Sequence, residues 1–275
     1  MNATTVTILG ALAGLTIFLG LPVARLRALS SRSQGFLNAV ATGVLIFLLV
    51  DILGKAVEPI HSALSTAHRG NVTTLVGLVA IYAVGVATGL LGLVYFNRAV
   101  LSRLRRFRLD GPGAAVAAAL PVAPTARSLA LMIACGLGLH NFSEGLAIGQ
   151  SAASGALAFT GVLMVGFGLH NITEGFGVAA PMAGEEQRPS WGFLGVAGLI
   201  GGGPTFLGTL VGYHVVSDYA FVLFLALAAG ALIYVINEMF VICRRLTTQS
   251  WLAPGLLLGF LAGFATDLFL TYHGG

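Results

Sequence analysis

Two polar hexapeptides stand out in a chain that is otherwise dominated by apolar residues. HNFSEG begins at His140 and HNITEG begins at His170, so one pattern, HNx[ST]EG, occurs twice. Residues i and i+4 lie on the same face of a helix, which places His140 beside Glu144 and His170 beside Glu174. Imidazole nitrogen and carboxylate oxygen together suit first-row divalent metals such as Zn²⁺, Fe²⁺, Mn²⁺ or Co²⁺. The two hexapeptides therefore predict a divalent metal site.

Both hexapeptides lie inside long apolar stretches. An ionisable side chain at the centre of a bilayer costs about 2.5 to 3.5 kcal/mol, so these groups need partners. Single polar residues in membrane helices often serve only as hydrogen-bonding contacts between helices, but a repeated polar hexapeptide favours the metal interpretation. Asn141 and Asn171 point about 100° away from their neighbouring histidines, where they would line a second, weaker position.

The composition is that of a membrane protein. Of the 275 residues, 57% are hydrophobic and 9% are charged, and the mean hydropathy is +0.93. Average soluble domains carry about 25% charged residues, so soluble enzymes, nucleic-acid-binding proteins and secreted disulfide scaffolds are excluded. The two cysteines, Cys135 and Cys243, form no CxxC motif, so a zinc knuckle is not indicated.

Eight apolar stretches are long enough to cross a bilayer, which requires about 20 residues of helix. They cover residues 5–24, 35–54, 75–96, 129–149, 155–180, 193–213, 219–242 and 251–272. The fourth and fifth spans carry the two hexapeptides. Because the connection between these spans is short, we expect them to pack antiparallel and to bring both His/Glu faces together near the middle of the membrane.

Basic residues predict the orientation. Twelve of the 14 Lys and Arg residues lie in or beside the first, third, fifth and seventh connections, and only Lys55 and Arg69 fall in the others. The positive-inside rule places the arginine-rich connections in the cytoplasm, so both termini face the extracytoplasmic side. The third connection, residues 97–127, is interpreted as a flexible cytoplasmic linker within a single transmembrane domain, residues 1–275. No loop contains a P-loop motif, which excludes an ATP-driven pump.

On the strength of HNFSEG, HNITEG, eight spans and a long third loop, the chain resembles the ZIP family, the zinc and iron permeases. The resemblance implies a divalent metal transporter of the plasma membrane that moves metal into the cytoplasm. Zn²⁺ is the first expected substrate, followed by Fe²⁺, Mn²⁺ and Cd²⁺. It also implies a 3+2+3 arrangement of helices with an inverted repeat. The metal ligands carried over from the family are His140, Asn141, Glu144, His170, Asn171 and Glu174.

Two further positions bear on the number of ions. Many bacterial members carry a glutamate on the sixth span, where this chain has Thr205 in GGPTFLG, so we expect one well-formed site instead of a full binuclear centre. Glu238 on the seventh span is an accessory ligand or proton acceptor, or a glutamate satisfied by neighbouring hydroxyls. Asp51 and Asp267 are placed near the outward ends of their spans, where they guide cations or are simply hydrated.

The partners expected are divalent metal ions and the lipid bilayer, with no nucleic acid, and a homodimer is left open. The chain is predicted not to be an enzyme. An intramembrane metal-dependent hydrolase with a glutamate as general base is the alternative, which the lack of an HExxH motif disfavours. A proton-coupled carrier of an organic solute is a third interpretation.

Overall fold

The computed structural model describes residues 2–26, 29–67, 72–108, 125–155 and 157–274. These residues form eight α-helices and three short 3₁₀ helices, and none of them is in a β-strand. The elements are α1 (Ala3–Leu15), η1 (Thr16–Leu19), η2 (Leu21–Arg25), α2 (Ser31–Ala67), α3 (Val72–Arg108), α5 (Ala126–Ala153), α6 (Leu157–Ala179), η3 (Ala180–Met182), α7 (Trp191–His214), α8 (Asp218–Leu246) and α9 (Gln249–Gly274).

Each span predicted from the sequence coincides with a helical segment, but two segments are longer than expected. Helix α2 continues to Ala67 instead of ending near residue 54. Lys55 is therefore inside a helix, and its assignment to a connection between spans was wrong. Asp51 is likewise in the interior of α2 and not near its end.

The arginine-rich segment after the third span is helical. Helix α3 runs without interruption to Arg108, so the first part of the predicted linker, residues 97–108, belongs to this helix and is not a loop. Residues 109–124 of the predicted linker lie outside the described residues.

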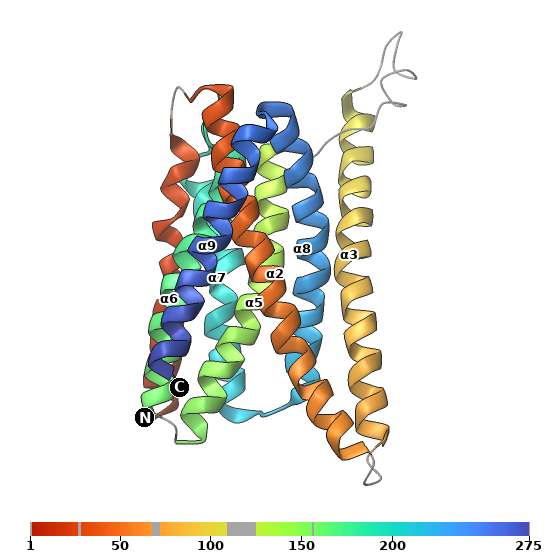
Figure 1. Ribbon diagram of the computed structural model, residues 1–275, viewed down its shortest axis with the longest axis vertical. Coiled ribbons are helices and arrows are strands. Elements are labelled where there is room, and N and C mark those ends of the chain that lie inside the picture. Colours follow the sequence, from red (N-terminus) through yellow and green to blue (C-terminus); the bar gives the residue numbers. More distant parts are fainter. Residues whose placement is uncertain (1, 27–28, 68–71, 109–124, 156, 275) are drawn as a thin grey trace.

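Seven of the eight predicted spans have the length and composition to cross a membrane. Among the described residues, α6, which carries the second polar hexapeptide, is not one of these seven. Large apolar side chains such as Val76, Val84 and Leu261 are exposed on the outside of the bundle, as expected where the solvent is lipid. The first turn of α1 and the last turn of α9 lie at the same end of the bundle (Figure 1).

The helices pack as two groups. In the first group α1, α6 and α7 contact one another and α5 packs along α7; in the second, α2 packs against α8 and α9, and α3 packs against α8. The groups meet where α5 contacts α8 and where α6 contacts α9 and α2. Helix α3 stands at the edge of the bundle and is the least buried of the candidate spans, whereas α5 is the most buried (Figure 1).

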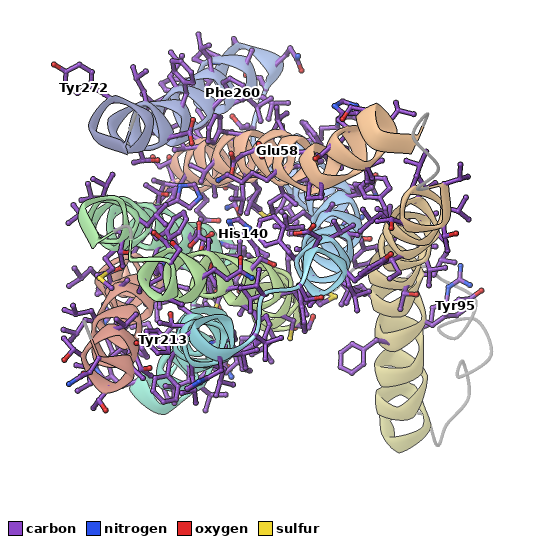
Figure 2. The ribbon with its side chains drawn as sticks, turned by 90° about the horizontal axis from the view of Figure 1, so that it is seen from below. Glu58, Tyr95, His140, Tyr213, Phe260 and Tyr272 are labelled. Carbon is purple, nitrogen blue, oxygen red and sulfur yellow. The ribbon has the colours of Figure 1, made fainter. Side chains whose placement is uncertain are left out.

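Glycine allows the backbones of α5 and α7 to touch. A Cβ atom at Gly208 would collide with the carbonyl group of Phe142, and one at Gly138 would collide with the carbonyl group of Ile200. Small residues at such positions are how membrane helices approach closely without a hydrophobic driving force. This contact fixes α5 in the middle of the bundle, where Figure 2 shows His140 enclosed by the surrounding helices.

Candidate metal centre

Both hexapeptides lie inside helices, the first in α5 and the second in α6. The predicted i, i+4 pairs are formed. His140 Nε2 lies 3.2 Å from Glu144 Oε1, and His170 Nε2 lies 3.7 Å from Glu174 Oε1. Each helix thus presents an imidazole and a carboxylate to the same neighbourhood, as the spacing predicted.

The two pairs converge on one point. His140 Nε2 is 3.9 Å from Glu174 Oε1 on the other helix, and the two imidazole rings have their centroids 6.1 Å apart. One donor atom from each of His140, His170 and Glu174 lies within 4.8 Å of the others. All three residues are buried, with Glu174 fully inaccessible. Two nitrogen donors and one oxygen donor therefore surround a single position, and Glu144 stands beside it.

Asn141 links the residues of this centre through hydrogen bonds. Its Nδ2 donates to Glu174 Oε2 at 2.7 Å, to Asn171 Oδ1 at 2.8 Å and to the Gly201 carbonyl at 3.0 Å. Asn171 Nδ2 in turn donates to the Ala13 carbonyl at 3.1 Å. The two amides thus link α5 and α6 to α7 and α1, and they occupy one oxygen of Glu174.

Thr266 on α9 orients the second histidine. Its hydroxyl donates to the Gly263 carbonyl at 2.7 Å and lies 3.4 Å from His170 Nδ1. Because the hydroxyl proton is already used, the threonine oxygen accepts from Nδ1–H, which leaves Nε2 as the atom with a free lone pair. Nε2 faces Glu174, so this tautomer directs a donor into the centre.

Several buried atoms of the centre have no hydrogen-bond partner among the described residues. They are both ring nitrogens of His140, His170 Nε2, Glu174 Oε1, Glu144 Oε2 and Asn141 Oδ1. Buried polar groups in folded proteins are nearly always paired, and leaving one unpaired costs about 1–3 kcal/mol. A cation bound between these atoms would satisfy several of them at once.

A cavity leads to the centre from one end of the bundle. Its volume is about 610 Å³, and its wall includes His140 and Glu144 at the inner end. Ser154 and Val216, in the α5–α6 and α7–α8 connections, mark its other end. These connections lie at the same end of the bundle as the start of α1 (Figure 1). The cavity therefore connects that end of the bundle with His140 and Glu144, at the edge of the buried centre.

Comparison with known protein families identifies the chain. The family model described as ZIP zinc transporter matches residues 116–271, which is 156 of the 275 residues and includes the whole of α5 to α8. The chain belongs to the ZIP zinc transporter family. A comparison with curated proteins finds no match. Members of the ZIP family are divalent metal transporters and not enzymes, so the hydrolase alternative is set aside, and the His/Glu cluster lies within the matched segment.

Other sequence-predicted residues have different surroundings in this ZIP protein. Thr205 is buried and packs against Gly14 of α1, and what α7 provides at the amide network is the backbone carbonyl of Gly201. Glu238 on α8 is partly exposed and is not among the residues that form the cluster or line the cavity in the described part of the chain. Its accessory role stays a prediction.

Sequence reasoning missed four groups at the centre and its cavity. Thr266 and the carbonyl groups of Gly201 and Ala13 carry no local signal, because a threonine or a backbone carbonyl looks the same anywhere in a helix. Lys55 was missed for another reason, since the apolar run was judged to end before it. Its i, i+4 spacing from Asp51 could have indicated a continuing helix.

Proposed function

We propose that the protein moves one divalent transition-metal ion at a time, with Zn²⁺ as the first expected substrate, across the cell membrane into the cytoplasm. His140, Glu144, His170 and Glu174 bind the ion on its way. The observation that carries this proposal is the convergence of buried, unpartnered donors from α5 and α6 at the inner end of a cavity.

The donor set supports a transition metal over Mg²⁺ or Ca²⁺. Those two ions prefer all-oxygen sites, whereas imidazole nitrogens with carboxylates suit Zn²⁺, Fe²⁺, Mn²⁺ and Cd²⁺. The set contains no thiolate, and thiolate-rich zinc sites tend to be permanent and structural. A site of two histidines and two carboxylates is suited to bind an ion and then release it.

The amide network supports a single ion. The hexapeptide spacing predicts that Asn141 and Asn171 line a second, weaker position, and Asn141 Nδ2 donates to Glu174 Oε2 and Asn171 Oδ1. An N–H group directed at these oxygens disfavours a second cation beside them. On α7, the position where many family members carry a glutamate is Thr205, which packs against α1. We therefore assign Asn141 and Asn171 to the edge of the site, holding the ligands in place.

The positions of the arginines and of the cavity mouth indicate the direction of transport. Arg25 and Arg127 both donate to carbonyl groups of the α6–α7 connection, Arg25 to Pro189 at 2.6 Å and Arg127 to Arg188 at 3.4 Å. These arginines cluster at the end of the bundle opposite the cavity mouth, and the positive-inside rule makes that end cytoplasmic. The cavity thus opens outward. Movement of the α1/α5/α6/α7 group against the other group, within a 3+2+3 inverted repeat, would open the site inward. A homodimer stays a prediction.

Uptake into proteoliposomes tests the proposal. Liposomes that contain the purified protein and a trapped zinc-sensitive dye should accumulate Zn²⁺, and Fe²⁺, Mn²⁺ or Cd²⁺ should compete where Mg²⁺ and Ca²⁺ do not. His170→Ala should reduce uptake to the level of empty liposomes. Glu186→Gln, which changes an exposed carboxylate in the α6–α7 connection, is the matched control and should transport normally.

Two results would overturn this function. One is the absence of metal-dependent uptake by wild-type protein above empty liposomes. The other is an uptake rate that is equal in wild type and in His170→Ala, since that would place the ion path away from the cluster.

A further inference from the structure

An ion pair lies on α2, within a segment that is long and apolar enough to cross a membrane. Lys55 Nζ is 2.6 Å from Asp51 Oδ2, one helical turn away, and the Asp51 side chain is only 13% exposed. Lys55 is the sole lysine in the sequence. Its side chain lines the same cavity as His140 and Glu144, so a positive charge borders the proposed path of a cation.

The ammonium group reaches across the cavity toward the metal centre. Lys55 Nζ lies 5.8 Å from the centroid of the Phe167 ring on α6, and Phe167 precedes His170 by less than one turn. Lys55 and Glu144 line the same cavity. The charges of Asp51 and Lys55 also act on His170 of the centre and on Asp267 of α9. The pair therefore contributes to the electrostatic field in which the ion binds.

A fixed positive charge at this place needs a reason. It repels an incoming divalent ion, and a partly exposed ion pair adds little to stability because solvent screens both charges. Two apolar residues would fill this part of α2 without the repulsion. The arrangement is therefore better explained by what Lys55 does to Asp51 than by stability alone.

The charges around the centre indicate what Lys55 does. Glu144 and Glu174 together carry two negative charges when they bind metal, and one divalent ion balances them. Asp51 adds a further negative charge beside the cavity, and Lys55, whose Nζ is 2.6 Å from Asp51 Oδ2, offsets it. Lys55 is the one lysine or arginine among the described residues that line the cavity, whereas the carboxylates among them are Glu58, Glu144 and Asp218. Without Lys55 the field around the centre would be more negative, and a more negative field holds a divalent ion more tightly.

We propose that Lys55 sets metal affinity: its ammonium group borders the cavity and offsets the charge of Asp51, so that the site holds its ion weakly enough to release it. This inference rests on the proposed function of the site. It assigns the Asp51–Lys55 pair a part in the speed of transport and none in direct ligation of the metal.

Metal binding and uptake by four variants test this role. Zn²⁺ affinity is measured on detergent-purified protein by competition with a chromophoric zinc indicator, and uptake is measured in proteoliposomes. Lys55→Met should lower the Kd for Zn²⁺ by about tenfold or more and also lower the maximal uptake rate. Lys55→Arg, which keeps the charge, should stay close to wild type. The double variant Asp51→Asn/Lys55→Met should return the Kd toward that of wild type.

Asp51→Asn alone makes the opposite prediction. It leaves Lys55 without its partner, so the uncompensated ammonium group should raise the Kd for Zn²⁺ by about tenfold. This variant and the double variant keep the test decisive if Lys55→Met is poorly folded. Arg245→Met removes an exposed cation at the other end of the bundle and is the control for loss of one positive charge.

The results separate this inference from the proposed function. If wild-type protein binds no Zn²⁺, the function itself is wrong and the role of Lys55 falls with it. If wild type binds Zn²⁺ but well-folded Lys55→Met binds equally or more weakly, only the role of Lys55 is wrong. An unchanged Kd in Asp51→Asn, or tight binding retained by the double variant, would also overturn it.

Discussion

The two hexapeptides share four of six letters but sit in different surroundings. The copy on α5 borders the cavity, where His140 and Glu144 form part of the wall and neither imidazole nitrogen of His140 has a hydrogen-bond partner among the described residues. The copy on α6 is enclosed. Glu174 is fully buried with one oxygen hydrogen-bonded to Asn141, and His170 is oriented by Thr266 on α9.

This difference teaches that the pattern supplies donor atoms while the neighbouring helices assign their roles. In the proposed function, the α5 copy would meet the ion first, because its side chains face the cavity. The α6 copy would hold the ion, because residues of other helices fix its donors from behind. The same asymmetry appears in the amides, since Asn141 donates to three acceptors and Asn171 donates to one backbone carbonyl.

Replacing each glutamate in turn tests this division of roles most severely. Glu174→Gln removes the carboxylate that faces both histidines and places an amide against the Nδ2 group of Asn141. Zn²⁺ affinity should fall by more than about 100-fold, beyond the range usual for residues that only support a ligand. Glu144→Gln should lower the affinity less, by about tenfold, because among the described residues Glu144 pairs with one histidine whereas Glu174 faces two. Indicator competition on purified protein measures both.

Equal losses in the two glutamate variants would show that the carboxylates are equivalent ligands and that the asymmetry of their surroundings has no consequence for binding. A larger loss of Zn²⁺ affinity in Glu144→Gln would mean that the α5 copy holds the ion and the α6 copy does not. Circular dichroism checks that both variants keep their helical content.

The second prediction concerns the hydrogen bonds that Asn141 donates to Glu174 and Asn171 of the α6 copy. Asn141→Ala leaves Glu174 Oε2 and Asn171 Oδ1 without their donor, so the carboxylate is free to rotate. Zn²⁺ affinity should fall by about 10- to 100-fold. Asn171→Ala removes one of the three acceptors of Asn141, so the fall in Zn²⁺ affinity should be several-fold smaller. Titration calorimetry measures the Kd for Zn²⁺ of the two variants and of wild type. Equal losses of affinity in the two variants would contradict this prediction.

The sequence predicts the donors of this site and their pairing, but not their unequal roles. His140, Glu144, His170 and Glu174 are recognisable because i, i+4 spacing is a local property, and the structure confirms both pairs. What the sequence leaves open depends on helices far away in the chain. It contains no sign that Thr266 faces His170, or that Gly201 accepts from Asn141.

The lengths of the helices were harder to predict than their positions. Hydropathy marks the most apolar part of a helix, so it could not show that α2 continues through Lys55 to Ala67 or that α3 continues to Arg108. Where charged residues enter a helix, its continuation depends on packing against distant parts of the chain, and that information is not local. Lys55 was therefore assigned to a connection although it lines the cavity.

Thr266 provides a third, smaller test of the enclosed copy. Thr266→Val removes the oxygen that accepts from His170 Nδ1–H, so the ring loses its preferred tautomer and orientation. Zn²⁺ affinity should fall by about tenfold, whereas Thr266→Ser, which keeps the hydroxyl, should bind as wild type does. Measuring the Kd of the two variants in parallel separates the hydrogen bond from packing. A similar loss in both would show that the methyl group matters and the hydroxyl does not.

The smallest effect on metal affinity is expected where the hexapeptide backbones are packed from outside. A Cβ at Gly208 would collide with the Phe142 carbonyl of the α5 copy, and one at Gly20 would collide with the Ile172 carbonyl of the α6 copy. Either Gly→Ala change should destabilise the fold by about 1–3 kcal/mol, seen as a lower Tm, with a nearly unchanged Kd. Gly203→Ala, where no atom lies within 4 Å of the new Cβ, should leave the Tm in place. Gly208→Ala and Gly20→Ala are then compared at an equal loss of Tm. If Gly208→Ala weakens Zn²⁺ binding more, the ligand geometry of the α5 copy depends on close packing. In that case both copies, and not the α6 copy alone, would hold the ion.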